Sequence, residues 1–219
     1  AILDYFGQVF NTGGGHVIFD AADDIRIGDP LTTSGGDVTL IARGGDWGGP
    51  TTRGIHGSNA VWFHSPTWAL IQALSSMFTP DQKHILIDGF YDDIASPSAE
   101  DEELLLRLAK TLTPEAQLEV NDVRRYKYDL TGADLMRKYL YQPTLNIDGI
   151  ISGHTAEGTK TLLPHEARAK VDIRMVPNMR PERMLQLLKD HMERHGYGDK
   201  IEVHVEDSYP PAKIRLKGN

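Results

Sequence analysis

The sequence predicts an α/β (α+β) chain with the βαββαβ order of a ferredoxin-like sandwich, in which a four-stranded antiparallel sheet carries helices on one face. Three observations predict this fold. Residues 167–176 alternate apolar and polar side chains, as a half-buried strand does. Residues 181–195 place apolar side chains at the spacing of an amphipathic helix. An alternating, β-branched segment at 37–43 is followed by another helical pattern at 66–78.

In chain order, the other elements complete this scheme and add a helical insertion. Residues 1–10 predict a short amphipathic helix, and residues 16–27 predict a strand, a turn and a second strand. The insertion covers about 79–143 and includes a helix that is acidic at its start and basic at its end, as the helix dipole favours. The predicted ranges are 84–87 for a short strand and 96–111 for this helix within the insertion, then 144–151 and 200–206 for the second and fourth strands of the sheet.

Composition and charge exclude several classes of protein. The 219 residues carry a net charge of −8, so no nucleic acid partner is expected, because phosphate binding needs clustered lysine and arginine. No apolar run approaches the roughly 18 residues of a membrane span, so no membrane partner is expected. Cysteine is absent, which excludes disulfides, thiolate metal sites and a cysteine nucleophile. No basic-then-apolar leader is visible, and we expect a cytoplasmic protein.

Four segments, taken in chain order, indicate a family. They read DIRIGDPLTTSGGDVTLIAR at 24–43, RGIHGSNAVWFHSP at 53–66, ILIDGFYDDI at 85–94, and GHTAEGTKTLLP at 153–164 followed by VDIRMVPNM at 171–179. Agreement of four ordered segments is not expected by chance. The chain resembles di-zinc metallopeptidases of the carnosinase, aminoacylase and succinyl-diaminopimelate desuccinylase family, over their lid (dimerisation) domain and the end of the first catalytic half.

This resemblance implies a division of the chain and an activity. Residues 1–36 would be a remnant of the catalytic domain, 37–208 the lid or dimerisation domain, and 209–219 a return segment toward the catalytic domain. The parent enzyme would be a zinc-dependent hydrolase of dipeptides or N-acyl amino acids, with two zinc ions, and a homodimer through its lid. The family's other metal ligands are not found here, so the isolated chain should be inactive and should bind no zinc tightly.

The resemblance assigns the substrate's terminal carboxylate to Arg174, because a guanidinium fork donates two parallel hydrogen bonds to such a group. The other interpretation of Arg174 is a surface salt bridge on the solvent face of its strand, and the alternation of the strand argues against it. The resemblance also makes Asp29 a zinc ligand, since carboxylates complete nitrogen and oxygen zinc sites. From spacing alone, Asp29 before Pro30 is more typical of a turn.

His56 matches the family's lid histidine, which reaches across the dimer and stabilises the oxyanion in the partner's active site. The other interpretation of His56 is a polar loop residue among glycines. The sequence departs from the family pattern just afterwards, because Gly57-Ser58 stands for Ser-Gly and Ser65-Pro66 for Asn-Pro. His64 therefore remains an alternative donor, and we favour His56.

Two further patterns favour structural interpretations. His191 and His195 stand four residues apart on a predicted helix, a spacing able to bind zinc. No glutamate adjoins His191 in the manner of a zinc protease motif, and the helix end favours dipole interaction and solvent exposure. The phrase Asp88–Asp92 resembles the family's metal-binding Gly-His-Tyr-Asp, but Phe90 replaces the histidine and cannot coordinate zinc.

A different class of function also fits the fold. A ferredoxin-like domain can be a non-enzymatic association or ligand-binding module, because this topology hosts many functions and an exposed sheet edge readily pairs with another. The full reading frame would separate the two hypotheses, since the enzyme needs the family's remaining metal ligands on either side of this segment.

Overall fold

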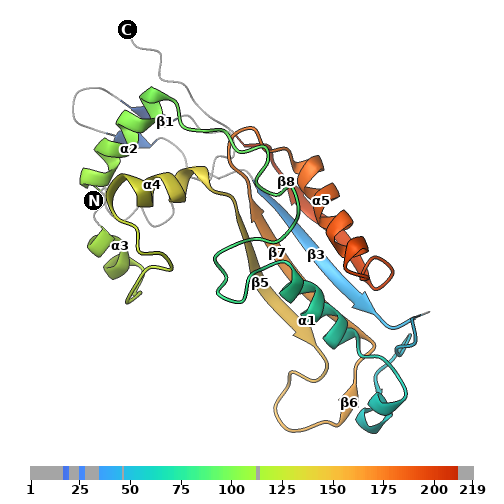
Figure 1. Ribbon diagram of the computed structural model, residues 1–219. Coiled ribbons are helices and arrows are strands. Elements are labelled where there is room, and N and C mark those ends of the chain that lie inside the picture. Colours follow the sequence, from blue (N-terminus) through green and yellow to red (C-terminus); the bar gives the residue numbers. More distant parts are fainter. Residues whose placement is uncertain (1–16, 20–24, 28–34, 46, 112–113, 212–219) are drawn as a thin grey trace.

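The computed structural model describes residues 17–19, 25–27, 35–45, 47–111 and 114–211, and it confirms the predicted sandwich. Its main sheet has four antiparallel strands in the order β5-β7-β3-β8 (Figure 1). These are the second, third, first and fourth strands of the predicted order, so β5 and β8 form the edges. The strand bounds are Gly35–Arg43 for β3, Thr144–Ser152 for β5, Glu166–Arg174 for β7 and Ile201–Ser208 for β8.

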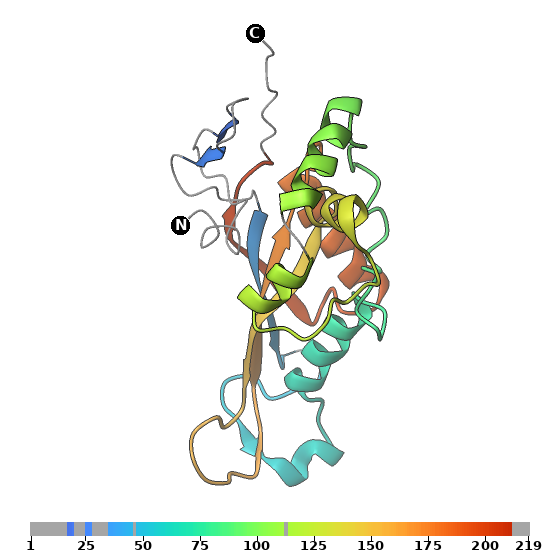
Figure 2. The same cartoon turned by 90° about the vertical axis from the view of Figure 1, so that its left-hand side faces the viewer.

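Two helices cover one face of this sheet, as predicted. Both α1 (Pro66–Ser76) and α5 (Pro181–Arg194) begin at a proline, whose fixed φ suits the first helical turn. Figure 2 shows them on the same side of the strands. The alternation of β7 sends every second side chain into the layer between sheet and helices. The core is centred on side chains from both layers that are wholly buried, including Leu40, Leu70, Val171 and Leu188.

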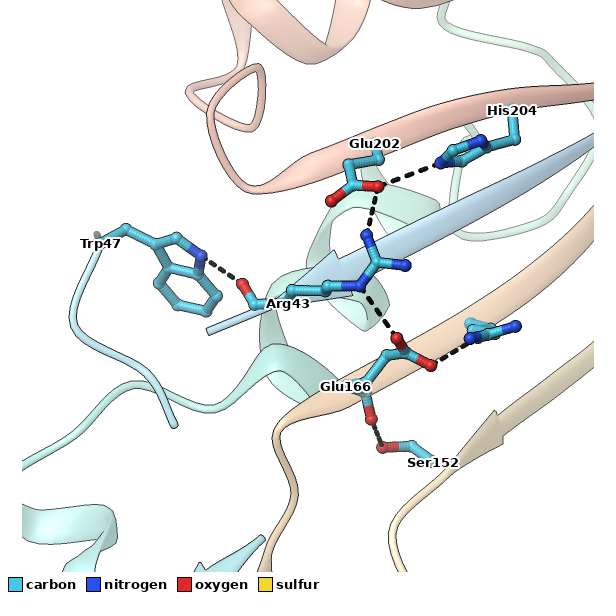
Figure 3. A network of polar contacts seen from close by, with 7 residues as sticks. Arg43, Trp47, Ser152, Glu166, Glu202 and His204 are labelled. Atoms are coloured by element: carbon cyan, nitrogen blue, oxygen red, sulfur yellow. Dashed lines mark hydrogen bonds and ion pairs between the residues drawn. The ribbon is translucent and has the colours of Figure 1, made fainter. Parts of the chain in front are cut away.

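The opposite face carries charged side chains that join the strands at one end of the sheet (Figure 3). Arg43 at the end of β3 donates from Nε to Glu166 of β7 over 2.9 Å and also pairs with Glu202 of β8. Ser152 of β5 donates to the backbone carbonyl of Glu166 over 3.0 Å, and His204 of β8 lies 3.0 Å from Glu202. Hydrogen bonding from Arg43 lowers the pKa of the Glu202 carboxyl, which favours its charged form.

The insertion between α1 and β5 contains helices, as predicted, and lies toward the opposite end of the sheet from β6 (Figure 1). A paired contact joins two of them, because Arg137 donates to both carboxylate oxygens of Glu102, from Nη2 over 2.6 Å and from Nε over 3.0 Å. The helix bounds are Ala99–Thr111 for α2, Pro114–Val120 for α3 and Gly132–Tyr141 for α4.

The strand predicted at 84–87 is wrong, because these residues form one bridge, between Ile85 and Phe78, and no strand. The amide of Ile85 donates to the Tyr91 hydroxyl over 2.9 Å, and the amide of Leu86 donates to a carbonyl of the preceding segment over 2.8 Å. A side chain and a turn therefore take the donors that a strand ladder would have used.

The Gly-Phe-Tyr-Asp-Asp phrase is a structural loop packed on α5. Gly89 has φ +79°, a conformation that side chains disfavour. Phe90 is 1% exposed and belongs to the core. Asp93 accepts an ion pair from Arg183 of α5 over 2.5 Å, so the loop is held to the helix by burial and by charge.

The start of the chain agrees with its prediction where it is described. The strands β1 (Val17–Phe19) and β2 (Ile25–Ile27) pair antiparallel, which confirms the two predicted strands, and the turn predicted between them lies outside the described residues. The helix predicted at 1–10 and the residue Asp29 lie outside the described residues. Among the helices that the structure describes, none is long and apolar enough to cross a membrane.

His191 is buried, which corrects the expectation of solvent exposure. It is 1% exposed, and its Nε2 lies 3.0 Å from Ser76 Oγ. The Ser76 hydroxyl donates to the carbonyl of Ala73 over 2.7 Å, so Nε2 of His191 must be the donor to Ser76. The apolar face of α5 thus includes a neutral histidine, and burial, aided by the charges of His195 and Arg194, lowers the pKa of His191 to about 4.

We expect His191 to make the domain acid-sensitive. Its pKa is lowered from 6.5 to about 4 on folding, so the unfolded chain binds the proton first as pH falls. The free energy of unfolding should fall by on the order of 3 kcal/mol as the pH is lowered from 6.5 to about 4, and it should stay at this lower value at more acidic pH. The pH dependence of urea unfolding should be reduced in His191→Gln and unchanged in the control His154→Gln, which replaces an exposed histidine of the loop after β5. Equal pH dependence in the wild type and His191→Gln would contradict this account.

Candidate functional site

His56 lies in a small hairpin at the end of the sheet. The strand β4 (Ile55–His56) pairs with β6 (Leu162–Leu163), and the 3-10 helix η2 (Gly57–Val61) follows directly. The glycines on either side of His56 allow the two segments to approach. A Cβ at Gly54 would come within 2.4 Å of the Leu162 side chain, and a Cβ at Gly57 within 2.9 Å of the Thr161 side chain. Side chains at both positions would push the histidine loop away from β6.

The His56 ring is oriented by its own loop. The backbone amide of Ser58 donates to Nδ1 of His56 over 3.2 Å. Because a backbone amide can only donate, Nδ1 must be unprotonated, and the neutral ring then carries its proton on Nε2. The side chain is exposed, so His56 presents an N–H donor to the surroundings.

His64 is placed differently. Its ring lies against Trp47, with ring centroids 5.6 Å apart, and its backbone amide donates to the carbonyl of Gly48 over 3.0 Å. Within the described part of the chain, no hydrogen bond holds either nitrogen of the His64 ring. The structure thus gives His56, and not His64, the fixed tautomer that a positioned donor needs.

Arg174 is the last residue of β7 and lies between Thr144 of β5 and Gly35 of β3 in the strand register. Its side chain is exposed, and its Nε lies 3.3 Å from Asp172 of the same strand. Burial raises the pKa of the Asp172 carboxyl, whereas the guanidinium of Arg174 lowers it. A carboxylate bound by Arg174 would therefore share the guanidinium with Asp172.

The two candidate residues lie at opposite ends of the sheet. His56 pairs with Leu162, just before β7 begins, and Arg174 is where β7 ends. A strand rises about 3.3 Å per residue, so β7 alone separates its two ends by about 26 Å. A dipeptide extends over a few ångströms per residue, so one copy of the chain cannot bring both side chains to the same small substrate.

The described residues supply no metal centre of their own. They contain no group of three or more histidine, aspartate or glutamate side chains that could hold a metal ion. Asp29, the predicted zinc ligand, lies outside them, so its role stays a prediction. The described residues therefore do not fit a zinc ion.

Comparison with known proteins adds the deciding observation. Residues 53–200 match the model of a family described as the peptidase dimerisation domain, which is most of the chain. The chain belongs to this family. The peptidase dimerisation domain begins just before His56 and extends past α5, so it contains both candidate residues. This membership confirms the predicted metallopeptidase lid and supports it over an association module unrelated to peptidases.

Two curated relatives match part of the chain. Beta-Ala-His dipeptidase of Mus musculus is 32% identical over 139 residues, which cover 60% of this chain and 28% of the relative. Cys-Gly metallodipeptidase DUG1 of Saccharomyces cerevisiae is 31% identical over 128 residues, which cover 58% of this chain and 26% of the relative. The chain therefore spans less than a third of either relative.

Solved structures share the fold. An M20 family metallo-carboxypeptidase from Sulfolobus solfataricus superimposes with a TM-score of 0.64 at 30% identity, over 78% of this chain and 43% of the other. The yeast di-peptidase Dug1p superimposes with a TM-score of 0.69 at 22% identity, over 83% of this chain and 38% of the other, which shows the fold alone.

Proposed function

We propose that this peptidase dimerisation domain is the lid of a cytoplasmic, zinc-dependent hydrolase of dipeptides or N-acyl amino acids. Residues 37–208 would form the lid, with 1–36 and 209–219 joining it to a catalytic domain. The names of the two relatives, a Beta-Ala-His dipeptidase and a Cys-Gly metallodipeptidase, support a dipeptide substrate and a metal. We propose two zinc ions, held by residues outside the described part of the chain. Such ions would supply a metal-bound hydroxide at neutral pH.

The proposed roles follow from the chemistry of the two exposed side chains. Arg174 would bind the substrate's terminal carboxylate, which is charged in the ground state, so its contribution is to binding. His56 would donate from Nε2 to the oxyanion of the tetrahedral intermediate, which exists only near the transition state. The acceptor contact at Nδ1 supports this role, because it fixes the proton on the outward nitrogen.

The two edges of the sheet differ in their suitability for pairing with a second copy. The exposed side chains of β8 include the carboxylates of Glu202 and Glu206, which would face like charges across a symmetric pair. Its counterpart β5 has one acidic residue and exposes Ile150 and Ile151, at 53% and 58%. We therefore propose a homodimer in which β5 pairs with β5 of the partner.

Apolar surface continues from β5 onto α1. The Thr67 hydroxyl lies 2.7 Å from the hydroxyl of Ser152 at the end of β5, and the next residue, Trp68, is 63% exposed. Ile71, one helical turn further along α1, is 40% exposed. Exposed apolar side chains of this kind mark protein interfaces, so α1 supports the same edge of the sheet as the contact.

The separation of His56 and Arg174 is the observation that carries the proposal. A two-fold axis through paired β5 strands would run the two sheets antiparallel. The end of one lid that carries His56 would then lie beside the end of the other lid that carries Arg174. One substrate could therefore meet a histidine from one subunit and an arginine from its partner, which one copy cannot provide.

The proposed edge can be tested on the purified chain. We expect sedimentation velocity to show a dimer, and Ile151→Asp to weaken it at least about tenfold, because a carboxylate would replace an exposed apolar side chain of the paired strand and would lose its water there. Val205→Asp is the matched control, since Val205 is an exposed apolar residue of the other edge strand, at 47%. A monomeric wild type at high concentration, or dissociation by Val205→Asp alone, would contradict the β5 interface.

The shared site can be tested by complementation in the full-length enzyme. Arg174→Ala should raise KM strongly, and Arg174→Lys should not restore it fully, because an ammonium lacks the fork. His56→Ala should lower kcat by about 10²–10³ with less change in KM.

Mixed dimers of His56→Ala and Arg174→Ala subunits should regain activity with a dipeptide substrate. Each mixed dimer has one site with both side chains intact, so a random mixture should reach about a quarter of wild-type activity. Absence of any gain in demonstrated mixed dimers would show that the two residues act within one subunit. Unchanged kinetics in both single variants would remove their proposed roles altogether.

A further inference from the structure

A group of three lysines surrounds one tyrosine in the insertion, away from the His56 hairpin. The ammonium nitrogen of Lys138, on α4, lies 4.1 Å from the centroid of the Tyr128 ring. Those of Lys83 and Lys127 each lie 5.9 Å from the same centroid. These positively charged groups come from three separate segments of a chain whose net charge is −8. The fold thus gathers cations where overall composition gives no reason to expect them.

The group is held together by specific contacts. The Tyr128 hydroxyl donates to the backbone carbonyl of Lys83 over 2.7 Å, which ties the loop after α1 to the segment before α4. The ammonium of Lys138 donates to Gln142 Oε1 over 2.5 Å. Lys127 also lies 6.0 Å from the ring centroid of Phe78. Two lysines therefore have a neighbouring group that restrains them beyond the shared tyrosine ring.

Carboxylates do not neutralise this group within the part of the chain that the structure describes. The ion pairs found there are made by arginine or histidine, and none involves Lys83, Lys127 or Lys138. Among the acidic residues nearby, Asp81 accepts from the Thr79 hydroxyl over 2.6 Å and from the backbone amide of Lys83 over 3.1 Å. Asp129 directly follows Tyr128 in the sequence, and Asp134 of α4 pairs with Arg137. In the described part of the chain, none of these carboxylates forms an ion pair with the three lysines.

The lysines also repel one another. Burial lowers the pKa of Lys138, and the charge of Lys127 lowers it further. Like charges held together raise the free energy of the folded chain unless an anion offsets them. A bound anion would remove this repulsion and accept hydrogen bonds from the ammonium groups.

We propose that Lys83, Lys127 and Lys138, arranged around Tyr128, form a binding site for a small oxyanion of the phosphate type, either free phosphate or a phosphate monoester. Three ammonium groups act as separate point charges with rotatable donors, which suits a tetrahedral oxyanion better than a planar carboxylate. The Tyr128 ring would hold the ammonium groups by cation–π contacts, and the anion would bind to the ammonium groups rather than to the ring. This site does not depend on the proposed peptidase function, because it uses neither His56 nor Arg174.

The test uses the purified chain in chloride buffer at constant ionic strength. Carbon-detected or proton–carbon NMR would follow the Cε resonances of the lysines while inorganic phosphate is added. A second titration would use glycerol phosphate. We expect saturable shifts at Lys83, Lys127 and Lys138. Saturation by phosphate alone would assign the site to the free anion, and saturation by both would extend it to monoesters.

Substitution of single lysines distinguishes a specific binding site from non-specific attraction of anions to the surface. Lys138→Gln should weaken phosphate binding at least about tenfold, because a charge-assisted hydrogen bond contributes on the order of 1.5–3 kcal/mol. Lys127→Gln should weaken it similarly, and Lys189→Gln, an exposed lysine of α5, should have no effect. Non-saturating shifts that are equal at Lys189, or unchanged affinity in both site variants, would overturn the proposal.

Discussion

The pairing of β7 with β3 on one side and β5 on the other is the constraint on which the rest of the structure depends. The register pairs every residue of β7 with one of β3, from Gly35 opposite Arg174 to Arg43 opposite Glu166. This places alternate side chains of β7 in the core beneath α1 and α5, and directs the others to the charged face. It also fixes the ends of the sheet, with Arg174 at one and the His56 hairpin at the other.

That geometry gives a physical reason for the dimerisation of this domain, if its two exposed side chains serve one substrate. About 26 Å of strand separates the ends, which no side-chain rotation can bridge. Pairing two lids antiparallel along β5 brings unlike ends together without any change in either copy. In this account the interface completes the site, so substitutions at β5 and at His56 would act on the same reaction by different routes. The polar network around Arg43 contributes by holding the strand ends that carry the histidine loop.

The sequence predicted best those elements whose pattern is local. The alternation in β7 and the apolar spacing in α5 determined the fold correctly, because burial on one face imposes a period on the residues themselves. The burial of His191 was missed, since its partner Ser76 lies on another helix and 115 residues away. The wrong strand at 84–87 has a similar origin, as the Tyr91 hydroxyl takes an amide that the pattern assigned to a ladder.

The candidate site could be predicted from the sequence only in part. The sequence placed Arg174 on a strand, as the structure does, and His56 in a loop, where the structure has the short strand β4. The separation of the two residues follows from strand register, which no short motif encodes. The contact between Arg174 and Asp172 could have been anticipated, because residues two apart on a strand share a face. The lysine group around Tyr128 could not have been anticipated, since it brings Lys83 to a tyrosine that lies 45 residues further along the chain.

The most direct measurement is the distance between the two ends of the lids in the dimer. The chain contains no cysteine, so Ala60→Cys beside His56 and Arg174→Cys can each carry a single, spectroscopically distinct spin label. Double electron–electron resonance would be measured on dimers formed from one chain labelled at residue 60 and one labelled at residue 174. Because each chain carries one label, only distances between subunits are reported. A doubly labelled chain diluted with unlabelled chain gives the distance within one subunit, which β7 sets at about 26 Å or more. The account predicts a clearly shorter distance between subunits than within one, and a distance between subunits that equals or exceeds the internal one would contradict it.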